Sequence, residues 1–411
     1  MYAKLLAGLA MAGSLLQAGE TQLLNEGQLT RLRDEAVRTH PSVAAGKDRA
    51  VAAAQDLRAV RLWDDPMVGL GLMVAQKSMR ADDGDIIIGV EQTLPKPGMF
   101  AAQRGKASAI QRAELENSRA AALTAGATAA RDAIELALAD ESVALQQTQV
   151  KWLAAMAENA RERAADPLGS GVDALRMETE LAKEQQMLDS ARRNRGAFAA
   201  RLNLALGRPL DAPWPVLQLP AAPPPVPIAL AEIARIAHAN PKVRALREMA
   251  GAAGQDTRIA DRERLPNMSV GIDANVYSGG DFRSATVGVK MSLPWFNDTS
   301  YQAKIAAAHS RERAADRDVE TLRREVAGDV LSAATEAANA AAQAHAYAGE
   351  IQAKALAASQ TIEAAWLSSK APLTDLLDAS RILFGIRLEQ RRFIAMQLAA
   401  LEQLQTLVPN R

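Results

Sequence analysis

The sequence predicts an α+β membrane protein with an internal duplication, in which very long α-helices accompany pairs of short β-strands. Three observations lead to this prediction: long alanine-rich stretches, two segments that alternate apolar and polar residues, and a repeat of the element order about 200 residues apart. The chain of 411 residues carries 48 basic and 48 acidic residues, so its formal net charge is zero. This even balance, without a basic stripe, argues against nucleic acid as a partner.

The helices are predicted from composition. Aromatic residues make up only 4% of the chain, whereas alanine recurs in runs such as "RAAALTAGATAARDAIELALA". Alanine is the strongest helix former, and its small side chain lets helices pack closely along small-residue seams. Cysteine is absent, which excludes disulfides, thiolate metal sites and a lipid-modified N-terminal cysteine.

Residues 1–18 are predicted to be a signal peptide. They contain Lys4, an apolar run from Leu5 to Leu16, and small residues around Ala18. The alternative is an amphipathic first helix. No later segment offers the roughly 18 uncharged apolar residues of a membrane-spanning helix, so any membrane crossing must use strands.

The duplication defines the predicted organisation. Short anchors recur in the same order: Pro41 and Pro241, Gln55 and Gln255, Pro66 and Pro266, Gly71 and Gly271, Pro95 and Pro294. We expect a first structural repeat at residues 19–207 and a second at 230–411. The proline-rich segment 208–229 between them is expected to be an extended linker, because proline prevents helix continuation.

Each repeat is predicted to contain two strands followed by a long helical hairpin. The strands lie near 67–75 and 85–94 before a hairpin at 96–206, and near 268–277 and 284–293 before a hairpin at 295–408. The helical pattern after each second strand runs unbroken to about Ala165 or Leu367. Helices of roughly 65 to 70 residues extend on the order of 100 Å.

The strands alternate apolar and polar residues. Val270, Ile272, Ala274 and Val276 share one face, opposite residues such as Gly271 and Asp273. Strands of about ten residues with this pattern suit a transmembrane barrel with an aqueous lumen, but also a half-buried sheet in a soluble α+β protein. Four strands cannot close a barrel, and an open edge is not tolerated in lipid. We therefore expect a trimer that shares a 12-stranded transmembrane β-barrel.

Several motifs resemble the TolC-like outer membrane factors over nearly the whole mature chain. They are "HPSV" and "NPKV" before the first helix of each repeat, the strand ends "VEQTLPKPG" and "VKMSLPWFND", and the hairpin returns "PLGSGVDALRMETEL" and "APLTDLLDASRIL". The segment "WDDPMVGLGL" together with "IGVEQTLPKPG" looks most like the branch that serves heavy-metal efflux pumps.

The resemblance implies a homotrimer with its β-barrel in the outer membrane of a Gram-negative bacterium and an α-helical barrel in the periplasm. It implies passive export of small substrates, and docking to a periplasmic adaptor (membrane fusion) protein and an inner-membrane RND-type pump. Two alternatives remain: the exit channel of a type I protein secretion system, and a soluble periplasmic coiled-coil scaffold.

No catalytic constellation, cofactor site or metal site is predicted, since the four histidines are scattered and without cysteine. By the resemblance, the hairpin turns form the periplasmic tip, with candidates Asp166, Ser170, Asp173, Lys370 and Asp375. A ring of carboxylates there would favour cations. Alternatively, Asp173 and Asp375 only complement a helix dipole. The candidates for the barrel lumen are Asp85, Glu91, Asp273 and Lys290.

Overall fold

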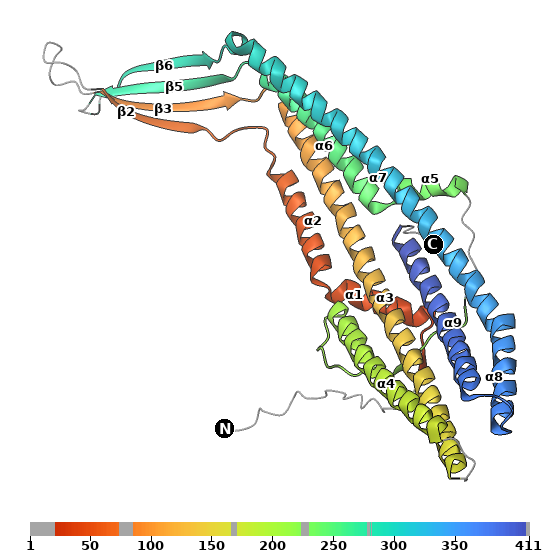
Figure 1. Cartoon of the computed structure of the whole chain (residues 1–411). Helices are drawn as coiled ribbons and strands as arrows, with labels where there is room; N and C mark the ends of the chain where they lie inside the picture. Colours follow the sequence, from red (N-terminus) through yellow and green to blue (C-terminus); the bar gives the residue numbers. More distant parts are fainter. Residues whose placement is uncertain are drawn as a thin grey trace, which may run out of the picture. The chain divides into compact units, whose positions relative to one another are not determined.

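The structure is a computed structural model, and it describes residues 21–73, 85–165, 171–222, 230–277, 280 and 282–407. The predicted signal peptide lies outside the described residues. The chain divides into two compact units, which we describe one at a time (Figure 1). Unit 1 comprises residues 1–41, 122–233 and 329–411, and unit 2 comprises residues 42–121 and 234–328.

Unit 2 contains the strands of both repeats. Its elements are α2 (Pro41–Ala59), β2 (Met67–Met73), β3 (Asp85–Leu94), the start of α3 (Met99–Ala164), the end of α5 (Leu230–Ala239), α6 (Pro241–Glu263), β5 (Met268–Tyr277), β6 (Phe282–Met291) and the start of α7 (Asp298–Ala346). The order α2-β2-β3-α3 therefore returns as α6-β5-β6-α7. A short 3₁₀ turn, Pro294–Asn297, precedes α7.

The four strands form one antiparallel sheet in the order β2-β3-β5-β6 (Figure 1). Its central pairing, between β3 and β5, joins the two repeats over ten residue pairs from Asp85 and Tyr277 to Leu94 and Met268. Strands β2 and β6 are its edges. Each edge presents backbone groups that have no partner strand within the described sheet.

Small residues bring the helices of unit 2 together. A side-chain carbon added at Gly46 of α2 would lie 3.3 Å from the Cα of Ser118 in α3. Two ion pairs join α3 to α6. Arg112 lies 2.7 Å from Glu248, and Lys106 lies 2.8 Å from Asp256. This packing agrees with the small-residue seams expected from the composition.

Unit 1 contains the two helical hairpins. Its elements are β1 (Thr21–Leu23), α1 (Glu26–Thr39), the rest of α3, α4 (Gly171–Ala205), β4 (Val216–Gln218), the rest of α7, a π-helical turn (Tyr347–Ile351), α8 (Gln352–Leu367) and α9 (Leu373–Leu407). A core of leucine, isoleucine and alanine side chains from α1, α3, α4 and α9 holds them together.

The predicted linker is partly a strand. β4 pairs in parallel with β1, from Thr21 and Val216 to Leu23 and Gln218. Two carboxylates of α3 hold it in place: Asp140 accepts a hydrogen bond from the backbone N–H of Leu217 at 2.9 Å, and Glu141 accepts one from Leu219 at 3.0 Å. The linker is thus fastened to α3 through its backbone.

The long helix of the second repeat differs from the prediction. In the first repeat α3 is continuous for 66 residues, but α7 ends at Ala346 and the π-helical turn separates it from α8. Gly349 in this turn has non-helical backbone angles, φ −94° and ψ −113°. Glycine favours helix about 1 kcal/mol less than alanine, and π-helical turns locally interrupt the i to i−4 bonding. The predicted unbroken helix to Leu367 is therefore wrong.

Candidate functional site

The ends of the two hairpins in unit 1 form the first candidate site, which we call the tip. The turn after α8 is closed by its own backbone: the N–H of Lys370 donates to the carbonyl of Ala365 at 2.7 Å, and Ser369 has a positive φ of 59°. Pro372 then precedes α9, which begins at Leu373. A proline just before a helix suits its fixed φ, so the sequence itself sets where α9 starts.

An apolar cluster joins the two hairpins at the tip. Its buried side chains come from all four helices: Leu153, Ala157 and Ala160 of α3, Ala174 and Met177 of α4, Trp366 of α8, and Leu373 and Leu376 of α9. Trp366 and Leu376 are 3% and 0% exposed. Burying side chains of this size contributes about 1.5–3 kcal/mol each, so the hairpin ends pack as one body.

Arg163 ties the end of α3 to the end of α8. Its guanidinium lies 4.5 Å from the ring centre of Trp366, and it donates hydrogen bonds to the backbone carbonyls of Trp366 and Leu367. These carbonyls belong to the last turn of α8, where helix carbonyls have no partner within the helix. The arginine supplies both donors and positive charge at the negative end of the helix dipole.

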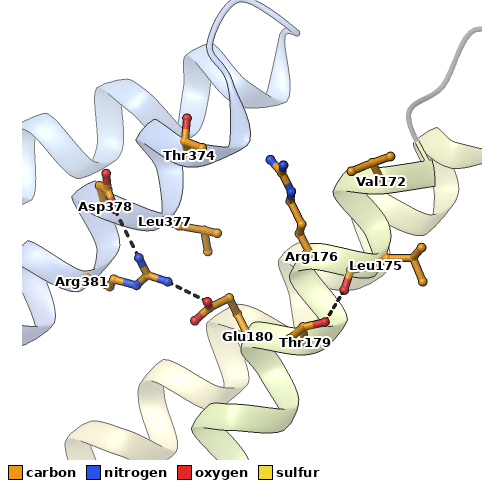
Figure 2. A pocket seen from close by; sticks show the side chains of 9 residues that line it. All are labelled: Val172, Leu175, Arg176, Thr179, Glu180, Thr374, Leu377, Asp378 and Arg381. Carbon is orange, nitrogen blue, oxygen red and sulfur yellow. Dashed lines mark hydrogen bonds and ion pairs between the residues drawn. The ribbon is translucent and has the colours of Figure 1, made fainter.

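A groove of about 470 Å³ runs between the starts of α4 and α9 (Figure 2). Arg381 of α9 reaches across it to Glu180 of α4 at 2.7 Å and also pairs with Asp378 at 3.3 Å. Val172 and Leu175 on the α4 side are 58% and 66% exposed. The groove therefore offers apolar side chains next to a charged pair. Its full lining is Val172, Leu175, Arg176, Thr179, Glu180, Thr374, Leu377, Asp378 and Arg381.

Three of the predicted tip residues, Asp173, Lys370 and Asp375, are not part of the groove lining. Asp173 is half-buried in the first turn of α4, and Asp375 is exposed in the first turn of α9. Lys370 is exposed in the turn between α8 and α9. Asp166 and Ser170 lie outside the described residues.

The groove residues Glu180 and Arg381 were missed by the sequence analysis. Arg381 alone could have been found from a local pattern. Asp378 precedes it by three residues on α9, and this spacing places opposite charges together on one helix face. Their pairing across α4 and α9 is not visible in the sequence, because the two residues lie 201 positions apart.

One face of the sheet in unit 2 is polar and carries three of the predicted lumen residues. Glu91 of β3 accepts hydrogen bonds from Ser269 of β5 and Lys290 of β6, and so links three strands. Asp273 lies over Gly89, where an added side-chain carbon would come within 2.2 Å of its carboxylate oxygen. Asp85, the fourth lumen candidate, is the first residue of β3 and pairs with Tyr277 in the register.

The other face of the sheet is apolar and exposed. The register aligns the apolar residues of all four strands: Val68 lies opposite Val90, Val90 opposite Ile272, and Ile272 opposite Val287. The exposed fractions of these side chains are 74% for Val68, 48% for Val90, 54% for Ile272 and 70% for Val287. In the described part of the chain no element covers this face. An apolar surface this contiguous marks a contact with another protein or with lipid.

The described residues hold no group of three or more histidine or acidic side chains arranged to bind a metal ion. Among them, no helix has both the length and the apolar character needed to cross a bilayer.

Comparisons with known proteins agree on the fold. The model of the outer membrane efflux protein family matches residues 233–409, which is most of the second repeat. No curated protein sequence matches the chain. Solved structures match nearly all of it.

Three of these structures are the outer-membrane channel OprN, the transmembrane channel CusC and the outer membrane protein VceC of Vibrio cholerae. OprN covers 92% of this chain and 89% of its own at 16% identity and a TM-score of 0.81. CusC covers 93% and 92% at 15% identity and a TM-score of 0.81, and VceC covers 93% and 96% at 15% identity and a TM-score of 0.78. The resemblance to outer membrane efflux proteins inferred from the sequence motifs is therefore confirmed, by the family model over the second repeat and by the fold over both.

Proposed function

We propose that this chain is one protomer of a homotrimeric outer-membrane exit duct that serves a tripartite efflux system. The observation that carries the proposal is the exposed apolar face shared by β2, β3, β5 and β6. A lipid surrounding would match an apolar strand face of this kind, and three copies of four strands would pair the free edges β2 and β6 into a closed barrel of twelve.

The polar face would then line the lumen. Glu91 and Lys290 neutralise each other, and together with Asp273 they keep the inner wall hydrated. A duct of this kind makes or breaks no bond, so the energy for export would come from an inner-membrane pump of the RND type. The family match and the fold of the solved channels support this role.

The tip groove is proposed as the docking place of a periplasmic adaptor protein. It combines exposed apolar side chains at Val172 and Leu175 with the polar groups Thr179 and Thr374 and the pair Glu180 and Arg381. A helical hairpin of the adaptor with an apolar stripe and flanking charges would match this surface. In the trimer, Asp173 and Asp375 would form a ring of carboxylates at the constriction and favour cations.

The substrate class is proposed from the strand-end motif alone. The TM-scores to CusC and to OprN are both 0.81, so the fold does not favour either channel as a guide to the substrate. The segment "WDDPMVGLGL" with "IGVEQTLPKPG" favours the branch that exports heavy-metal cations. Deletion of the gene should then lower the tolerated concentration of divalent metals more than that of organic drugs; the reverse order would remove the metal assignment.

The duct itself is tested by fractionation and electrophysiology. Cell membranes are separated on a density gradient, the protein is extracted in detergent, sized without boiling, and inserted into planar lipid bilayers. The proposal predicts a trimer in the outer-membrane fraction and discrete conductance steps. A monomer released by osmotic shock without detergent would favour the periplasmic scaffold and refute the duct. For the tip, unchanged cation preference in an Asp173→Ala, Asp375→Ala double variant would refute the carboxylate ring.

A further inference from the structure

Three cationic or protonatable side chains converge at the junction of α5, α6 and α7 in unit 2. His238, near the end of α5, lies between two guanidinium groups. Arg247 of α6 places its Nη2 2.9 Å from the Nδ1 of His238, and Arg323 of α7 places its Nη1 3.0 Å from the Nε2. We refer to these three residues as the junction cluster.

The junction cluster has more hydrogen-bond donors than acceptors. A guanidinium only donates, and a neutral imidazole accepts at one nitrogen and donates at the other. At most one of the two contacts to His238 can therefore be a hydrogen bond, and the other brings two donors together. The Nε of Arg323 is also buried, and it has no hydrogen-bond partner among the described residues.

The neighbouring carboxylate does not correct this excess. Glu320 accepts from the Nη2 of Arg323 at 2.7 Å and from the Nε of Arg324 at 2.9 Å. Hydrogen bonds from these two arginines lower the pKa of Glu320 to about 2, so it is ionised at neutral pH. Its single negative charge faces Arg323 and Arg324, and Arg247 adds a further positive charge on the other side of His238.

Space for a ligand lies directly beside Arg247. A groove of about 470 Å³ between α6 and α7 begins at this residue. Its floor includes Ala250 and Gly251, and no heavy atom lies within 4 Å of the place where a side-chain carbon of Gly251 would be. The groove lining also includes Arg258, Glu312 and Asp316, whereas His238 and Arg323 are not part of it.

We propose that the junction cluster binds an oxyanion, a phosphate or a carboxylate, which takes the place of the His238 ring against the guanidinium groups of Arg247 and Arg323. Such a group offers several acceptor oxygens that can receive guanidinium N–H groups from two sides, in place of the water that the exposed side chains of His238 and Arg247 otherwise meet. His238 would then donate to the ligand or to a ligand-bound water rather than face a second donor. No part of the family resemblance assigns a ligand to this junction.

The test uses the purified full chain in detergent. Inorganic phosphate and sodium succinate are titrated separately by calorimetry, with sodium chloride at matched ionic strength as the reference. Saturable binding that falls at least about tenfold in both Arg247→Gln and Arg323→Gln is the expected result. Tighter binding of phosphate would identify a phosphoryl group as the natural ligand, and tighter binding of succinate would identify an acidic side chain or peptide.

Two further variants keep the result interpretable. Arg313→Gln is the matched control, because Arg313 is an exposed arginine of the same helix that contacts Ser310, and it should leave the affinity unchanged. Glu320→Gln removes the competing carboxylate and should tighten binding several-fold, a gain that misfolding cannot produce. Absence of saturable binding, or equal affinity in wild type, Arg247→Gln and Arg323→Gln, would mean an adventitious ion only and would overturn the proposal. The tip and the sheet take no part in this experiment, so its outcome leaves the proposed duct untouched.

Discussion

An arginine placed on the apolar face of β6 should disrupt assembly, whereas the same residue one position further on should not. Val287 lies near the middle of β6, opposite Ile272, and is 70% exposed. Gly288 points to the polar face, and no heavy atom lies within 4 Å of the place where its side chain would begin. Val287→Arg and Gly288→Arg therefore add the same charge at the same depth on opposite faces, with steric room in both cases.

The expected difference follows from the lipid that would surround the proposed barrel. Arginine on the lipid face of a barrel costs about 2–4 kcal/mol near the bilayer midplane. This corresponds to about a 30- to 1,000-fold loss for each chain, and a trimer carries three copies. Gly288→Arg keeps its charge in water and adds only repulsion from Lys290 two positions away, about 1 kcal/mol or less.

The assay is the fraction of detergent-extracted protein that migrates as a trimer without boiling, at matched expression. Val287→Arg should abolish the trimer, and Gly288→Arg should leave most of it. Equal loss in both variants, or a greater loss in Gly288→Arg, would refute the assignment of the two faces.

Three further predictions concern unit 1. Arg163→Ala removes the stacking on Trp366 and two hydrogen bonds to the end of α8. It should therefore lower the free energy of unfolding by about 1–3 kcal/mol and speed amide exchange at Trp366 and Leu367. An unchanged exchange rate would show that Arg163 does not stabilise the end of α8. Asp140→Ala leaves the charge of Arg195 and the N–H of Leu217 without their buried acceptor. The free energy of unfolding, measured by urea denaturation, should therefore fall by about 3–5 kcal/mol. A fall of less than about 1 kcal/mol would show that Asp140 does not hold the linker in place. Burial raises the pKa of Glu402 despite its pairing with Arg33. The contribution of this group to stability is therefore fully present below the unfolded pKa of about 4.5 and is lost as pH rises through the folded pKa. Wild type should gain stability relative to Glu402→Gln when the pH is lowered from 7 to 5, and parallel curves of unfolding free energy against pH would contradict this.

The strands could be found in the sequence because their signal is local. An alternation with period two reports both the strand and its faces, and β2, β3, β5 and β6 begin within two residues of the positions that the alternation indicates. The same alternation does not say which strands pair. The central contact between β3 and β5 joins residues that are 174 to 192 positions apart, and only the duplication indicated that the two hairpins would be neighbours.

What the sequence analysis missed depends on long-range packing or on single backbone positions. The groove at the tip exists because α4 and α9 lie side by side, which brings Glu180 to Arg381. The strand β4 arises in a proline-rich segment because Asp140 and Glu141, far away on α3, accept hydrogen bonds from its backbone. The break at Gly349 occurs in a stretch whose alanine content favours helix. The composition therefore predicted a continuous helix, and the effect of one glycine on the backbone was not visible in it.

The central claim is that the two faces of the sheet meet different surroundings, and the absence of cysteine from the chain allows a direct measurement. Single cysteines are introduced in turn at Thr286, Val287, Gly288 and Val289 of β6, and the protein in outer-membrane vesicles is treated with a maleimide that does not dissolve in lipid. Rapid labelling at residues 286 and 288 with protection at 287 and 289 is the result that a lipid-facing apolar surface and a water-filled lumen predict. Labelling of all four positions at similar rates would show that water reaches both faces, and would contradict the transmembrane assignment.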